Sequence, residues 1–235
     1  MTDEEWQNLI HRSQSGYDER EMEYYRIIAE WEDFHHRDDA NIFDVMFRDV
    51  CDTISEDGLT SIVVEVSKAL GVPVPHLNEN AEALAYIKSE TVDDHEMLEL
   101  YYNWEMLKKA GINNQNAFEL VVTHELAHRY FKDQILGLCA NESWSQELAC
   151  DYMTGVIACE QNLATGKYKW VVGSMYCSKS HPPGEIRKKV VAYSVEYYKD
   201  MLSRNEDITL QNCLDGFTVF MMMNGGEIQR AMGIV

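Results

Sequence analysis

Apolar residues recur every three to four positions through the first 70 residues of the chain, which is the spacing of helices that bury one face. Met22, Tyr25 and Ile28 illustrate this repeat. Three helices are predicted, over residues 17–36, from Asn41 to about Gly58, and from Thr60 to Leu70. Gly71 and Pro73 follow the third helix and predict its end. Residues 1–70 are therefore predicted to form a helical N-terminal region.

The pattern changes over residues 72–114. Prolines are expected to hold residues 72–77 in an extended conformation. The short apolar runs at 83–87 and 97–102 predict strands, although 97–102 also fits a helix. The cluster Gly111-Ile112-Asn113-Asn114 predicts a turn. A small sheet is therefore expected in this part of the chain.

Helical spacing returns after Asn116. Four helices are predicted, from Asn116 to about Gly137, from Ser143 to Ala164 with Gly166 ending it, from Ile186 to Leu202, and from Leu210 to Met223. The apolar run 217–223 indicates a buried core helix, with a methionine-rich partner groove as the alternative. The expected fold is α+β: mostly helical, with a small sheet and an N-terminal helical extension.

The strong negative charge limits the classes of partner. The formal net charge is −20, which argues against nucleic acid and anionic lipid, because both require a basic face. Residues 1–60 hold 17 acidic and 5 basic residues, a net charge of −12. This excess indicates a solvated helical surface. The alternative is a docking surface for a basic protein partner.

The sequence also predicts a cytoplasmic protein that does not span a membrane. No stretch approaches the roughly 20 consecutive apolar residues that a transmembrane helix requires. The first residues, Met1 to Glu5, are acidic and lack the basic-then-apolar pattern of a secretory signal. The six cysteines include no Cys-x-x-Cys pair, so reduced thiols are expected in place of a disulfide framework.

The string Thr123-His124-Glu125-Leu126-Ala127-His128 carries the candidate chemistry. Residues four apart lie about 40° apart around a helix, so His124 and His128 can reach one metal ion. Glu125 lies about 100° from His124, where it can accept a proton from a water on that ion. The preceding segment 118–122 is mostly apolar and directs the motif toward a core. The alternative is an ordinary helix with two unrelated histidines.

Further candidate residues follow in the next two helices. Glu147, after 18 intervening residues, can supply a third metal ligand. Asp151 lies one turn further and can accept a hydrogen bond from a ligating histidine, unless both acids simply face solvent. His181 and Arg187 are candidates for stabilising an oxyanion. The alternative for them is a helix-entry turn without chemistry.

These motifs together resemble the minimal gluzincin pattern, and are most similar to HtpX-like peptidases and soluble Lit-type phage-exclusion peptidases. The strings that carry the resemblance are 124–128, Glu147-Leu148-Ala149-Cys150-Asp151, and His181-Pro182-Pro183 with Arg187. They occur in the family order and cover roughly residues 72–200. HtpX-like peptidases are membrane proteins, whereas no spanning segment is predicted here.

The resemblance implies a zinc-dependent endopeptidase domain over residues 71–235, acting on a peptide or protein substrate. It implies that His124, His128 and Glu147 are the Zn²⁺ ligands and that Glu125 is the base. It also implies that Asp151 orients a ligating histidine and that His181 or Arg187 faces the substrate cleft. It also implies that substrate pairs with an extended strand beside the motif helix, either 81–87 or 97–102.

Three other functions fit the same residues. A zinc-holding regulatory or peptide-binding protein could use the scaffold without catalysis, although binding alone does not need Glu125. A structural or interaction protein would hold no metal. A zinc hydrolase acting on another bond is the third alternative, because the ligands do not name the bond that is cut.

Overall fold

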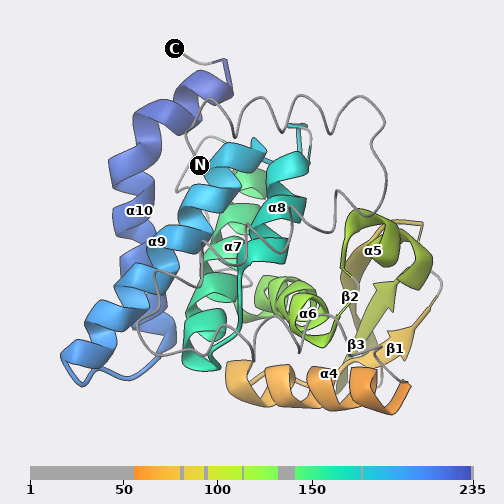
Figure 1. Ribbon diagram of the computed structural model, residues 1–235. Coiled ribbons are helices and arrows are strands. Elements are labelled where there is room, and N and C mark those ends of the chain that lie inside the picture. The colour runs from red at the N-terminus through yellow and green to blue at the C-terminus, as the bar shows by residue number, and fades with distance from the viewer. Residues whose placement is uncertain are drawn as a thin grey trace.

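The structure is a computed structural model that describes residues 56–79, 82–92, 95–112, 114–131, 141–175 and 177–233. These residues form seven helices: α4 (Glu56–Leu70), α5 (Trp104–Ala110), α6 (Gln115–Tyr130), α7 (Glu142–Glu160), α8 (Gly166–Ser174), α9 (Gly184–Ser203) and α10 (Leu210–Ala231) (Figure 1). They also form three strands: β1 (His76–Asn78), β2 (Ala85–Val92) and β3 (His95–Tyr102). The predicted mostly helical α+β fold is confirmed.

The helix α6, which carries the motif, lies at the centre of this arrangement. It packs against α4 and β2 on one side and against α7 and α8 on the other, and α7 in turn packs against α9 (Figure 1). The side chains of Phe118, Leu120, Val122 and Leu126 on α6 are fully buried. The apolar face of α4 belongs to the same core. The motif helix is therefore covered by other elements on several sides.

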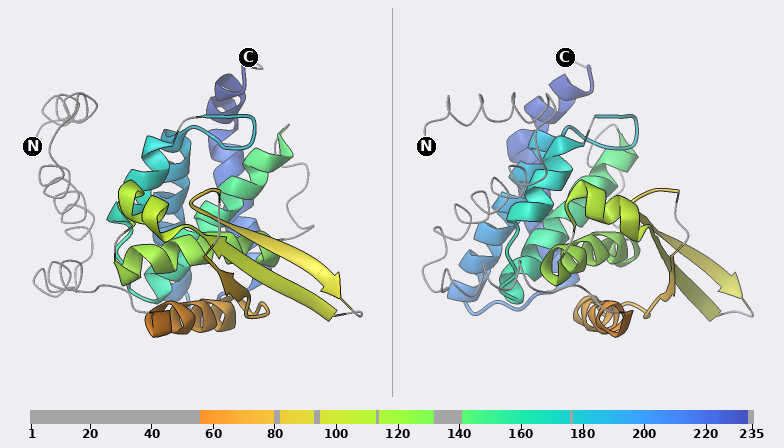
Figure 2. Two further views of the ribbon diagram at one scale, coloured as in Figure 1. Left: turned by 90° about the vertical axis from the view of Figure 1, so that its right-hand side faces the viewer. Right: turned by 45° about the vertical axis from the view of Figure 1, so that its right-hand side comes forward.

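The three strands form one mixed sheet in the order β1-β3-β2. The central strand β3 pairs in parallel with β1 and antiparallel with β2, with Leu100 opposite Ile87. The far part of the β2–β3 hairpin extends away from the helices (Figure 2), and residues 88–91 are exposed. The segment 97–102 is thus a strand, as its first interpretation predicted, and β2 forms an edge of the sheet.

Local caps explain where the central helices begin and end. The Asn114 side chain accepts a hydrogen bond of 2.7 Å from the Ala117 N–H at the start of α6. Gly71 after α4 and Gly111 after α5 both have positive φ angles, +64° and +98°, which favour glycine. The helix end predicted at Gly71 and the turn predicted at Gly111 are therefore found.

The close approach of α7 and α9 depends on a glycine. A Cβ atom on Gly155 would lie 1.9 Å from Ser194 Oγ and 2.6 Å from the Val191 carbonyl oxygen. The absence of a side chain lets the two helices come together at this point. This contact holds the helix of Glu147 and Asp151 beside the helix of Arg187.

Several predicted boundaries are wrong. Gly58 lies inside α4 and does not end a helix, and α7 ends at Glu160 and not at Ala164. Asn162 has a positive φ of 55°, and the Asn116 side chain binds both the N–H and the carbonyl of Ala164, so this segment cannot continue the helix. Gly166 begins α8 and does not end α7.

Two short helices, α5 and α8, were not predicted, and α10 continues to Ala231. The run 217–223 is buried on one face only: Phe217 and Phe220 are in the core, whereas Met222 is 78% exposed and Met223 is 72% exposed. The helices predicted over 17–36 and from Asn41 lie outside the described residues, apart from the last part of the second.

Replacement of Glu119 by glutamine tests the packing of α4 against α6. Burial, with a smaller effect of Glu65, raises the pKa of Glu119 from 4.5 to about 7. Protonated Glu119 therefore makes its full contribution to the free energy of unfolding below pH 4.5, and this contribution is lost as the pH rises through 7. After allowance for partial solvent screening, Glu119→Gln should stabilise the fold by ~1–2 kcal/mol at pH 8 and by little at pH 4.

Chemical denaturation at both pH values measures this difference. Glu196→Gln serves as the control, because Glu196 is an exposed residue of α9. An equal effect of the Glu119 substitution at both pH values would contradict the raised pKa of Glu119.

Candidate metal centre

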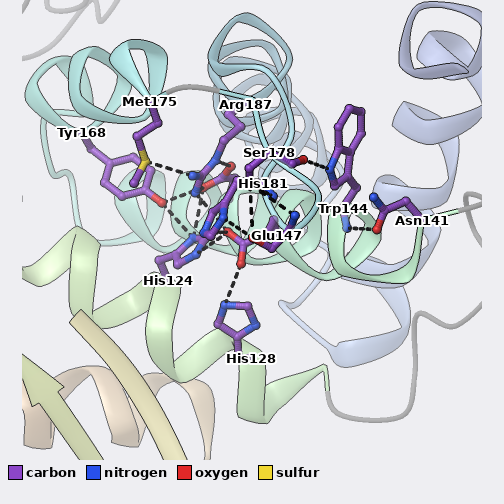
Figure 3. A network of polar contacts seen from close by, with 12 residues as sticks. His124, His128, Asn141, Trp144, Glu147, Tyr168, Met175, Ser178, His181 and Arg187 are labelled. Carbon is purple, nitrogen blue, oxygen red and sulfur yellow. Dashed lines mark hydrogen bonds and ion pairs between the residues drawn. The ribbon is translucent and has the colours of Figure 1, made fainter. Parts of the chain in front are cut away.

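The motif histidines and Glu147 come together where α6 faces α7 (Figure 3). The distance from His124 Nε2 to Glu147 Oε2 is 3.3 Å, and the distance from His128 Nε2 to Glu147 Oε1 is 3.5 Å. One donor atom from each of the three residues lies within 4.8 Å of the others. The three residues that the sequence predicted as ligands therefore form one buried group.

The polar atoms of this group fit a metal ion. Glu147 Oε2 is buried and makes no hydrogen bond, although His124 Nε2 lies 3.3 Å and Arg187 Nη2 3.5 Å from it. A buried carboxylate oxygen without a hydrogen bond is unfavourable, and a cation in contact with it would remove that penalty. Two imidazole nitrogens face the same carboxylate, so the His124, His128 and Glu147 group could hold a metal ion.

Asp151 fixes the ring of His124 from the opposite side. Its Oδ1 lies 3.0 Å from His124 Nδ1, and its side chain is fully buried. A carboxylate only accepts hydrogen bonds, so Nδ1 carries a proton, and a metal ion bound at Nε2 would replace the proton on the ring nitrogen that faces Glu147. The structure places Asp151 as predicted, behind the ring and away from the donor atoms.

The Arg187 guanidinium binds the Asp151 carboxylate and does not project freely into the cavity. Its Nε donates to Asp151 Oδ2 at 2.6 Å and its Nη2 to Oδ1 at 2.9 Å. The remaining Nη1 donates to Met175 Sδ at 3.2 Å. The Arg187 side chain is 3% exposed, so its guanidinium is committed to contacts within the protein.

Tyr168 on α8 completes this network and was not predicted. Its hydroxyl donates to Asp151 Oδ1 at 2.6 Å and lies 2.9 Å from His124 Nδ1, from which it can accept (Figure 3). Tyr168 is 44 residues from His124 in sequence and lies in a helix that the apolar pattern did not reveal. No local signal could have connected it with the motif.

The ionisable side chains of the group change one another's pKa values strongly. Burial alone would lower the pKa of His124, but the neighbouring carboxylates of Asp151 and Glu147 raise it to about 10. Burial lowers the pKa of His128 to about 4. Burial would raise the pKa of Glu147, but His124, His128 and Arg187 lower it to about 2. The group therefore presents a carboxylate and a neutral imidazole over a wide pH range.

Glu125 lies in the same cavity as the three donor residues. Burial raises its pKa to about 7, and the charge of Glu147 adds to this rise, while His124, Arg187 and the backbone of Ile87 oppose it. A carboxyl group with a pKa near neutrality can both accept and release a proton under physiological conditions. This position is the one predicted for the base.

His181 lies at the wall of this cavity, on the loop before α9. Its Nε2 is 3.7 Å from Glu147 Oε2, and its side chain is 40% exposed. Its Nδ1 lies 2.9 Å from the hydroxyl of Ser180. The Nε2 edge therefore faces Glu147 at the wall of the cavity.

The loop of His181 is attached to the start of α7. The Asn141 side chain donates to the Lys179 carbonyl at 2.9 Å, and the Trp144 indole donates to the Ser178 carbonyl at 3.0 Å. Asn141 also caps α7 through the Trp144 N–H. Glu147 lies one turn further along α7, so the helix fixes His181 and Glu147 relative to each other.

No family model, curated protein or solved structure matches the chain. Among the helices of the described part, none has the length and apolar character needed to cross a bilayer. The geometry of the His124, His128 and Glu147 group and of the cavity beside it is therefore the feature that bears on function.

Removal of the Tyr168 hydroxyl should weaken metal binding without unfolding the protein. Partners that orient a ligating histidine contribute about 10–100-fold in metal affinity. We therefore expect Tyr168→Phe to lower the affinity for Zn²⁺, used as the probe ion, by about that factor. Competition with a chromophoric chelator measures the dissociation constant, and thermal unfolding measures stability.

Tyr152→Phe is the matched control for this substitution. Tyr152 is also fully buried and is next to Asp151 in sequence, but its hydroxyl makes no hydrogen bond. Its loss should leave the Zn²⁺ affinity unchanged. Equal affinities of the two variants would show that the Tyr168 hydroxyl does not support the site.

Proposed function

We propose that the protein is a zinc-dependent endopeptidase. The observation that carries this proposal is the position of Glu125, a partly buried acid with a pKa of about 7, in the same cavity as three converging metal donors. A site that only held a metal would not need such an acid. The arrangement instead supports proton transfer beside a metal ion.

The donor set is consistent with zinc. Two imidazole nitrogens and one carboxylate occur in catalytic zinc sites, in which a fourth position remains for water or substrate. A bound Zn²⁺ would lower the pKa of a water molecule toward about 7 and polarise a carbonyl group. Asp151, Tyr168 and Arg187 would keep His124 in the tautomer that such binding requires.

The role of Glu125 is to transfer a proton. It accepts a proton from the attacking water and then passes it to the nitrogen of the leaving amine. Its raised pKa favours both steps, because the group is neither permanently ionised nor permanently protonated near pH 7. The hydrogen bond from the Ile87 backbone keeps the carboxylate directed into the cavity.

His181 is better placed than Arg187 to stabilise an oxyanion. The guanidinium of Arg187 is already bound by Asp151 and Met175 and is almost inaccessible. The ring of His181 is partly exposed, and its Nε2 faces the donor group. We therefore assign the oxyanion contact to His181 and a positioning role, through Asp151, to Arg187.

The edge strand β2 is the better candidate for binding an extended substrate. Of the two segments considered, 97–102 lies in the central strand β3, which is paired with β2 throughout and with β1 over part of its length. The start of β2 at residues 85–87 instead lines the cavity. A peptide bound along this edge would pass directly beside Glu125.

Replacement of Glu125 by glutamine separates metal binding from hydrolysis. We expect Glu125→Gln to retain about one zinc per chain and to lose about 10²–10⁴-fold in peptide cleavage, because the general base is absent. Elemental analysis measures the metal, and mass spectrometry of a mixed peptide library measures cleavage.

His76→Gln provides a control, because this residue is exposed on β1 and is not part of the metal group. Cleavage by the Glu125 variant at the wild-type rate would overturn the mechanism. Metal bound without any cleavage by the wild type would favour a zinc-holding regulatory protein or a hydrolase of another bond.

A further inference from the structure

The cavity beside the metal group is larger than the reacting atoms require. Its volume is about 720 Å³. A water molecule occupies about 30 Å³ in the liquid, and small-molecule sites measure about 300–1,000 Å³. Space therefore remains for part of a substrate beyond the bond that is cut.

The wall of this space has two chemically distinct parts. Its ionisable groups, apart from two tyrosines, belong to the site described above: His124, Glu125, His128, Glu147, His181 and Arg187. The rest of the wall described by the structure is aliphatic, with two tyrosines and the thioethers of Met106 and Met175. No carboxylate or ammonium in that part is available to pair with a charged ligand.

The aliphatic part is built by helices on one side of the motif helix. Its central members come from α5, the turn after it, α6 and α8, namely Met106, Leu107, Ile112, Val121, Val171 and Val172. Val121 lies one turn before Glu125 on α6, so the aliphatic wall begins beside the proposed base. Both α5 and α8 lie above α6 in Figure 1.

We infer that this part of the cavity is a specificity pocket for a large aliphatic or aromatic side chain of the substrate, adjacent to the bond that is cut. This inference deepens the proposed function and rests on it. A leucine, methionine or phenylalanine side chain would lose its contact with water against these walls. A charged side chain would lose its hydration without gaining a partner, and is therefore disfavoured.

Binding of amino-acid hydroxamates tests the pocket without requiring hydrolysis. A hydroxamate can bind zinc through its own oxygens, and its side chain can be varied separately. The probes are leucyl, alanyl, aspartyl and lysyl hydroxamates. The quantity to be measured is the dissociation constant of each probe with the zinc-loaded Glu125→Gln protein. The leucyl probe should bind about 10–100-fold more tightly than the alanyl probe, and the two charged probes should bind more weakly than the alanyl probe.

Charge substitutions at Met106 locate the pocket. Met106 is 38% exposed and lines the cavity, so either charge can be accommodated without burying it completely. Met106→Lys should tighten the aspartyl probe and Met106→Glu the lysyl probe, each by about tenfold, and both should weaken the leucyl probe. The same substitutions at Met97, which is 39% exposed on β3 and outside the cavity wall, should change none of the three.

The outcomes distinguish failure of the pocket proposal from failure of the proposed peptidase function. A leucyl preference that responds to Met106 but not to Met97 supports the pocket, even if the wild type cleaves no peptide and the proposed function fails. Peptide cleavage together with equal binding of all four probes overturns the pocket and leaves the proposed function intact. Identical effects of the Met106 and Met97 substitutions also overturn it. Failure to bind zinc overturns both.

Discussion

The centre depends on one buried anion, the carboxylate of Asp151. A fully buried charge is strongly unfavourable unless it is paired and hydrogen-bonded. Here Arg187 binds both oxygens, Tyr168 donates to one of them, and His124 contacts the same oxygen. The four residues come from α7, α9, α8 and α6, so satisfying one carboxylate fixes the relative positions of four helices. This network therefore fixes the His124, His128 and Glu147 group from the Nδ1 side of the His124 ring.

Residues related by helical spacing could be predicted from the sequence. His124 and His128 are one turn apart on α6, and Glu147 and Asp151 are one turn apart on α7. A local pattern determines such pairs, and the helices that carry them were also expected. The meeting of the two pairs was predicted from chemistry, because two imidazoles and a carboxylate need a common cation.

Features that depend on contacts between distant segments could not be predicted. Tyr168 and the cavity wall formed by α5 and α8 belong to helices of seven and nine residues, too short for a clear apolar repeat. The assignment of β2 as the edge strand depends on the pairing order of the sheet. Arg187 was expected near the substrate, but the buried charge of Asp151 is its stronger partner.

The Asn141 side chain links the start of α7 to the loop before α9. It caps α7 through one atom and holds the loop of His181 through the other. Because Trp144 adds a second anchor, the backbone of the loop before His181 cannot move away from α7 without breaking both bonds. The proposed catalytic groups would thus be preorganised, and little ordering entropy would be lost on binding of a ligand. Adaptation to different ligands would then fall to the opposite, strand-lined side of the cavity.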